Sequence, residues 1–198
     1  MGRMKLKFCI VLIMGLLFST EMKCQEVAIK TNLLYDALMN INAGVEVGLA
    51  PKWTLDVSGD YNGWKFSHQR QWKHWMVQPE ARYWFCDRFQ GWFLGVHAHG
   101  GQYNVGGGLD NSIDFLGTDL SPLGENRVQG WFVGAGVGAG YAVALSKHFN
   151  LEFELGIGYA YTKFDKYRCT TCDSKIESDK DHHYFGPTKA EIGFVYLF

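Results

Sequence analysis

Two cysteines and two histidines lie close together near the end of the sequence and could bind a metal ion. Cys169 and Cys172 form a C-x-x-C pair, and His182 and His183 begin ten residues further on. Two thiolates and two imidazoles make a ligand set for tetrahedral zinc, although this spacing is not that of a known zinc finger. Because a secreted chain favours disulfides, a Cys169–Cys172 disulfide is the first hypothesis, zinc the second, and free or redox-active thiols the third.

Two other patterns resemble catalytic or cofactor-binding motifs without meeting the requirements of either. His97 and His99 alternate on one face of an expected strand, and no serine or cysteine lies close by in the sequence to act as a nucleophile. Residues 134–140 carry glycine at every second position, whereas a dinucleotide-binding loop needs G-x-G-x-x-G at the start of a helix. We therefore predict no catalytic residue, no cofactor and no enzyme activity. The glycines are expected to leave room for large neighbours, namely Trp84, Phe93 or Phe132, with a ligand cavity as the alternative.

Ten charged side chains fall on the polar face of the expected strands and should form a network inside the fold. They are Lys30, Glu46, Asp56, Asp60, Glu80, Arg82, Glu152, Glu154, Lys189 and Glu191. Because buried charges must be paired or neutralised, we expect Arg82 to clamp a carboxylate through bidentate hydrogen bonds and the two lysines to pair with others. Seven acids against three bases leave an excess of four, so some acids should be protonated, hydrated or near the rim. A packed polar interior is the main interpretation, and a proton or ion path is the alternative.

The elements that position these residues are strands, because apolar and polar residues alternate with period two and a helical period is absent. In residues 151–161, for example, Phe153 and Leu155 alternate with Glu152 and Glu154. The sequence predicts eight strands, at residues 27–34, 41–50, 53–64, 73–85, 91–102, 129–145, 149–161 and 188–198.

A soluble sandwich would show the same alternation, but three features favour a membrane barrel. The segments run to about 9–12 residues, the length of a tilted transmembrane strand. Aromatic residues such as Trp53, Trp75 and Trp131 stand at strand ends, as in the girdles of membrane barrels. The last strand ends on Phe198, which resembles the signal read by the barrel-assembly machinery. The predicted fold class is therefore all-β, an eight-stranded antiparallel transmembrane β-barrel in the cell outer membrane.

The connections between the expected strands alternate in length. An even number of strands puts both chain ends in the periplasm. The short connections 51–52, 86–90 and 146–148 would then be periplasmic, with Cys86 as an unpaired thiol. The longer connections would face outward, and they are 65–72, 103–128 and 162–187.

Residues 1–24 are expected to be a secretory signal peptide, and residues 25–198 the barrel domain. Arg3, Lys5 and Lys7 precede an apolar run of 11 residues, which is too short to cross a bilayer as a helix. A lipoprotein anchored through Cys24 is the weaker alternative, because Lys23 does not fit a lipobox.

The composition excludes nucleic acid as a partner. The net formal charge of the 198 residues is -1, so the chain lacks the basic surface that phosphate binding requires. Aromatic residues make up 16% of the chain, and 24 glycines stand against 4 prolines, which suits an all-β fold with close backbone approaches.

Five motifs resemble an outer-membrane family of Bacteroidota that is catalogued only as a domain of unknown function. They are KTNLLYD at 30–36, YNGW at 61–64, WKHW at 72–75, QPEARYW at 78–84 and YFGPTKA at 184–190. The resemblance spans essentially the whole mature chain and departs at Gly63, where the family tends to have proline. It implies a small outer-membrane barrel of the OmpA and OmpX type and supplies no catalytic residues. Because members often occur alongside fimbrial and surface-adhesion proteins, it also implies an accessory role at the cell surface.

The first functional hypothesis is a non-enzymatic outer-membrane barrel whose outer loops, 103–128 and 162–187, bind a fimbrial, adhesion or other envelope partner. A purely structural membrane barrel and a narrow channel are the alternatives, and an outer-membrane enzyme that uses His97 or His99 is a remote one.

Overall fold

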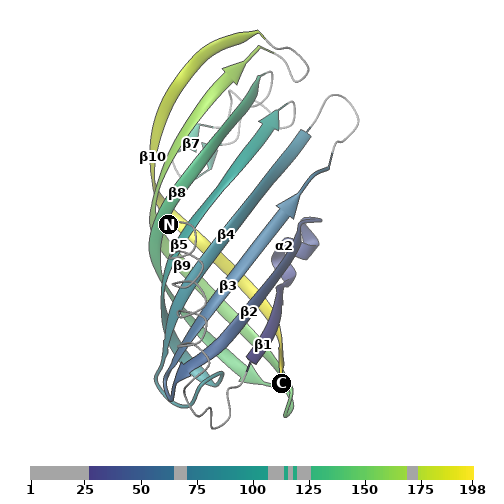
Figure 1. Cartoon of the computed structure of the whole chain (residues 1–198), viewed down its shortest axis with the longest axis vertical. Coiled ribbons are helices and arrows are strands. Elements are labelled where there is room, and N and C mark those ends of the chain that lie inside the picture. Colours follow the sequence, from purple (N-terminus) through teal and green to yellow (C-terminus); the bar gives the residue numbers. More distant parts are fainter. Residues whose placement is uncertain (1–26, 65–70, 107–113, 116–117, 120–125, 169–173) are drawn as a thin grey trace, which may run out of the picture.

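The computed structural model describes residues 27–64, 71–106, 114–115, 118–119, 126–168 and 174–198 (Figure 1). The predicted signal peptide and the pair Cys169 and Cys172 lie outside these residues, so both stay predictions. No helix in the described part of the chain is long and apolar enough to cross a membrane.

Across the described residues, eight antiparallel strands form a closed ring, the topology of a barrel. The strands are β1 (Val27–Asn32), β2 (Ile41–Ala50), β3 (Trp53–Asn62), β4 (Gln71–Trp84), β5 (Gly91–Gly106), β8 (Arg127–Ala144), β9 (Phe149–Tyr167) and β10 (Lys175–Leu197). Each strand pairs with the next in this order, and β10 pairs with β1 to close the ring. The prediction of an all-β fold with eight antiparallel strands is confirmed.

Three short elements were not predicted. The strands β6 (Asp114–Phe115) and β7 (Thr118–Asp119) pair with each other outside the ring, and the helix α2 (Leu33–Ala37) follows β1. The helix has five residues, too few to produce a helical period in the sequence. Asn32 caps it, because its side chain accepts a hydrogen bond from the Leu34 N–H.

The predicted outer ends of four strands were wrong, because paired backbone continues beyond them, furthest in β9 and β10. β9 runs to Tyr167 and β10 begins at Lys175, so most of the expected loop 162–187 is a hairpin. Likewise β5 runs to Gly106 and β8 begins at Arg127. In the hairpin of β9 and β10 the added residues are mostly polar on both faces, so the period-two alternation stops although the strands do not.

The two faces of the ring have opposite character. The outward face exposes apolar side chains along every strand between its ends, including Ile29, Val45, Val57, Val77, Val96, Val137, Leu155 and Phe194. The inward face is polar: Glu46, Glu80 and Arg82 are among its most deeply buried side chains. Alternate residues of one strand serve the two faces because successive side chains of a strand point to opposite sides.

An apolar cluster closes the end of the ring where the short turns lie. It consists of Ala28, Trp84, Phe89, Phe93, Ala142 and Val195. Phe89 comes from the turn between β4 and β5, with a φ of 62°, an unusual backbone conformation for a bulky residue. The Asn150 amide donates a hydrogen bond of 2.6 Å to the Phe89 carbonyl and holds this turn inside the ring. The turn therefore plugs the ring, which the sequence did not predict.

The opposite rim of the ring slants, because the strands lengthen from 6 residues in β1 to 23 in β10. The hairpin of β9 and β10 rises highest in Figure 1. β1 pairs with β10 only from Ala28 and Leu197 to Asn32 and Gly193.

One edge of the tall strand β10 is left open by this short pairing. The Asn32 side chain extends the contact between β1 and β10, since it accepts a hydrogen bond from the Ile192 N–H and donates one to the Ala190 carbonyl. In the described chain, the residues of β10 that precede Ala190 have backbone pairing with β9 alone. Pro187 is tolerated there because an edge strand needs no donor on its free side.

Candidate functional sites inside the ring and at its outer end

Arg82 on β4 lies at the centre of a buried network of carboxylates. Its Nη1 donates to Glu46 at 2.8 Å and to Glu152 at 2.9 Å. Its Nη2 donates to Glu154 at 2.8 Å and to Glu191 at 3.4 Å. The guanidinium also lies 4.6 Å from the centre of the Phe93 ring, which joins the charged layer to the apolar plug. The expected bidentate clamp on one carboxylate is not what Arg82 makes, since it shares its hydrogen bonds among four carboxylates with one bond to each.

Lys30 on β1 neutralises one side of the network. Its ammonium is paired with Glu46 and lies 3.1 Å from Glu152 and 3.7 Å from Asp56. The other oxygen of Glu46 accepts a hydrogen bond from Thr54, whose hydroxyl in turn accepts one from the Trp84 indole at 2.9 Å. The network is thereby fixed to the plug at a second point.

Lys189 on β10 neutralises the other side. Its ammonium is paired with Glu80 and lies 3.0 Å from Glu154 and 3.2 Å from Glu191. The ion pairs of Arg82 and the two lysines therefore link six strands across the inside of the ring: β1, β2, β3, β4, β9 and β10.

All ten charged residues singled out in the sequence are buried in the ring. Asp60 stands apart from the rest, because its carboxylate pairs with His74 Nε2 at 2.8 Å. A further cation, Arg88, was missed: a Cβ added to Gly48 would lie 2.0 Å from Arg88 Nη1, so its guanidinium packs against that glycine. Arg88 lies in a turn, where no alternation of polar and apolar residues could have predicted that its side chain points inward.

The glycines of β8 make room for large side chains. A Cβ added to Gly134 would lie 2.4 Å from His99 Nε2, and one added to Gly140 would lie 2.3 Å from Phe93 Cζ. The room that was predicted for Phe93 is therefore present. His97 and His99, expected on the inward face, are both buried there, and His97 Nε2 is 2.8 Å from the Thr188 hydroxyl.

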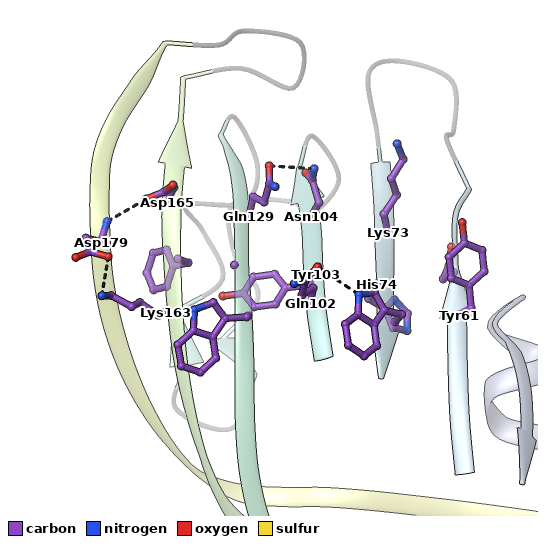
Figure 2. A pocket seen from close by; sticks show the side chains of 15 residues that line it. Tyr61, Lys73, His74, Gln102, Tyr103, Asn104, Gln129, Lys163, Asp165 and Asp179 are labelled. Carbon is purple, nitrogen blue, oxygen red and sulfur yellow. Dashed lines mark hydrogen bonds and ion pairs between the residues drawn. The ribbon is translucent and has the colours of Figure 1, made fainter. Parts of the chain in front are cut away.

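The outer end of the ring holds a pocket of about 450 Å³ that the sequence did not predict (Figure 2). Its walls come from the outer parts of β3, β4, β5, β8, β9 and β10. The lining combines aromatic rings with amides and charges; it is Tyr61, Asn62, Lys73, His74, Trp75, Gln102, Tyr103, Asn104, Gln129, Gly130, Trp131, Lys163, Phe164, Asp165 and Asp179. The pocket joins residues up to about 118 positions apart, so no local motif could have revealed it.

Ion pairs fix the wall of this pocket at the hairpin of β9 and β10. Lys163 lies 2.7 Å from Asp179, and Lys175 lies 2.6 Å from Asp165 (Figure 2 draws the first pair). The hydrogen bond from Lys175 lowers the pKa of Asp165, and a bond from the Asp179 N–H adds to this effect. The hydrogen bond to Asp179 raises the pKa of Lys163. At neutral pH this wall therefore presents charges of both signs.

The two histidines proposed as zinc ligands are separated by the strand that carries them. His182 pairs with Thr162 and His183 with Tyr161 in a regular part of β10, so their side chains point to opposite faces of the hairpin. His183 Nδ1 is bonded to the Tyr159 hydroxyl. One zinc ion could not be coordinated by both imidazoles, so the hypothesis of a four-ligand site with Cys169 and Cys172 is weakened.

Fold and site together define a class: an all-β ring of eight antiparallel strands with a charged interior. Residues 9–198 match the family described as Protein of unknown function (DUF3575), and the chain belongs to that family. The expectation of a family of unknown function is thereby confirmed. No curated protein and no solved structure matches the chain.

Replacing Arg82 by alanine should lower the free energy of unfolding by about 3–5 kcal/mol, because it leaves buried carboxylates without a cation. Urea unfolding of the folded protein, followed by tryptophan fluorescence, measures the loss. Arg127→Ala is the matched control: that guanidinium lies over the Tyr167 ring at the outer end, at 4.1 Å, and its removal should cost about 1 kcal/mol or less. Equal losses in both variants would contradict the central role of Arg82.

Replacing Gly95 by alanine should also destabilise the ring, by about 1–3 kcal/mol. The added Cβ would lie 1.6 Å from Glu80 Oε1, so the carboxylate would have to move away from its partners. Gly59→Ala is the control in the same sheet, because its nearest neighbour would be 3.5 Å away, an ordinary contact. The same unfolding measurement tests the pair, and a loss at Gly59 as large as that at Gly95 would refute the steric argument.

Proposed function

We propose that this chain is a non-enzymatic outer-membrane β-barrel that crosses the bilayer with its eight strands and binds a surface partner at its outer end. The observation that carries the membrane part is the outward face. Leu155, in the middle of β9, is 75% exposed, and exposed apolar residues surround it on the neighbouring strands. A contiguous apolar surface of this kind must be covered by a partner or by lipid. A membrane barrel has this arrangement, with an apolar face outside and a polar interior.

Two bands of aromatic side chains border the apolar face. Near the short turns, Trp53 contacts Tyr83 with ring centres 5.2 Å apart, and Trp92 contacts Tyr141 at 5.0 Å. Towards the other end, Trp131 and Tyr161 lie 5.8 Å apart. Aromatic girdles of this kind are typical of the two interfaces of a membrane.

The spacing of the two bands suits an outer membrane. Trp53 and Tyr61 are eight residues apart on β3, and Trp131 and Tyr141 are ten apart on β8. At about 3.3 Å per residue and a tilt of about 40°, this gives roughly 20–25 Å across the bilayer, against about 25 Å for known barrels.

The filled interior favours a scaffold over a channel. The charged network and the apolar plug occupy successive layers inside the ring. A purely structural barrel is therefore the second candidate function, and it differs from the first only at the outer end.

The pocket and the tall hairpin are the features that favour partner binding. Together they offer aromatic rings, amides and fixed charges of both signs on a rigid ring, the arrangement in which loops and rims carry binding sites. The resemblance of the sequence motifs suggests a fimbrial or adhesion component as the partner.

Replacing Leu155 by arginine tests the membrane proposal. If lipid covers this residue, the free energy of unfolding from phospholipid vesicles should fall by about 2–4 kcal/mol. The control Ile176→Arg changes an exposed residue of the hairpin, beyond the aromatic band, and should alter stability by less than about 0.5 kcal/mol. If Leu155→Arg is as harmless as the control, water rather than lipid faces this surface.

A photo-crosslinking amino acid at Lys163 tests partner binding in intact cells. It should form one specific adduct with an envelope protein, which disappears when residues 164–180 are replaced by a short turn. The same group at Lys52, in a turn at the opposite end, should not form that adduct. If no adduct forms at Lys163 while the barrel is folded, the purely structural role is favoured.

A further inference from the structure

Three side chains inside the ring bring possible metal ligands together. Glu80 on β4, His97 on β5 and Glu154 on β9 each offer one ligand atom, and these atoms all lie within 4.8 Å of one another. The three residues are 1%, 1% and 2% exposed, so bulk water does not satisfy them.

Each of the three residues keeps one side-chain atom without a hydrogen bond. Glu80 uses its Oε2 to pair with Lys189, and Glu154 uses its Oε2 for Arg82. The Oε1 atoms of both glutamates and Nδ1 of His97 are buried without a hydrogen bond. The Lys189 ammonium already contacts the Oε2 atoms of both glutamates, so a further cation or a proton would satisfy the Oε1 atoms. Leaving these buried atoms unpaired is costly.

Glycines keep the space around these atoms open. A Cβ added to Gly95 would lie 1.6 Å from Glu80 Oε1, and one added to Gly138 would lie 2.5 Å from Glu154 Oε1. Gly95 and Gly138 face each other in the register of β5 and β8. A Cβ added to Gly156 would lie 2.9 Å from His97 Cε1. The backbone around the three ligands is thus free of side chains where the ligands approach it.

The charge of the interior also favours a cation. The network contains six carboxylates and three cations, Arg82, Lys30 and Lys189, while Asp60 stands apart and pairs with His74. A divalent ion would offset two of the excess negative charges at a place where two carboxylates lie within 4.8 Å of each other.

We propose that Glu80, His97 and Glu154 bind one divalent first-row transition-metal ion, such as Zn²⁺ or Mn²⁺, inside the ring. Two carboxylate oxygens and one imidazole nitrogen suit these ions, whereas Ca²⁺ and Mg²⁺ prefer oxygen ligands alone. The bond between His97 Nε2 and the Thr188 hydroxyl would orient the ring, as outer partners of metal-bound histidines do. The ion would join β4, β5 and β9 across the interior. Among the described residues, no ion pair connects β5 to another strand.

The test measures metal bound to the full mature protein, folded in detergent with one equivalent of Zn²⁺ or Mn²⁺ and then desalted. Wild type should retain about one ion per chain by elemental analysis. His97→Ala should bind at least about ten-fold more weakly. His99→Ala is the matched control, because that histidine is buried two residues along the same strand but is not one of the three ligands, and it should retain the ion.

Circular dichroism establishes that each variant is folded, and Co²⁺ absorption gives a second readout of nitrogen and oxygen ligation in wild type. Three results would overturn the proposal. One is a wild type that retains no ion, in which case a proton shared by Glu80 and Glu154 fills the place. The second is equal retention by His97→Ala and His99→Ala. The third is binding that survives His97→Ala and disappears when Cys169 and Cys172 become serine.

Discussion

The burial of Arg82 among carboxylates is the interaction on which the rest of the interior depends. A guanidinium without water must be paired on several sides at once, and Glu46, Glu152 and Glu154 reach it from β2 and β9. Side chains that converge on one point need empty space opposite them, and glycine on the facing strands provides it. A shift of one residue in the pairing of any of these strands would turn its carboxylates outward and leave Arg82 without those partners. The network therefore also specifies the register of the strands.

The fold places in its interior what a soluble protein places on its surface. Each strand divides its residues between a charged inner face and an apolar outer face, and the described residues form no large apolar core between layers. Apolar packing is concentrated in the small cluster around Trp84 at one end. Stability of the ring in isolation must therefore rest on backbone pairing and on the charged layer, and the outer face contributes only when something apolar covers it.

The sequence predicted those parts of the molecule in which one strand face differs from the other. Over 149–161 the alternation of Phe153 and Leu155 with two glutamates is strong, and strand and burial follow from it. Beyond Tyr161 both faces of the hairpin are polar, so the pattern ends although pairing continues. The inserted Phe89 and the outer pocket depend on turns and on residues far apart in the chain, which periodicity does not describe. The buried charges could be predicted because they lie in strands, but their partners could not.

The seam between β1 and β10 has a consequence for how the ring forms. It joins Ala28 to Leu197, so the last ladder to form links segments at opposite ends of the described chain. Contacts between such distant residues form slowly, because a long loop of chain must be closed first. The other pairings between neighbouring strands can form earlier, as a curved sheet with two open edges. Until β10 pairs with β1, those open edges could pair with another copy of the chain. This topology therefore requires that both edges be protected from such pairing while the ring forms.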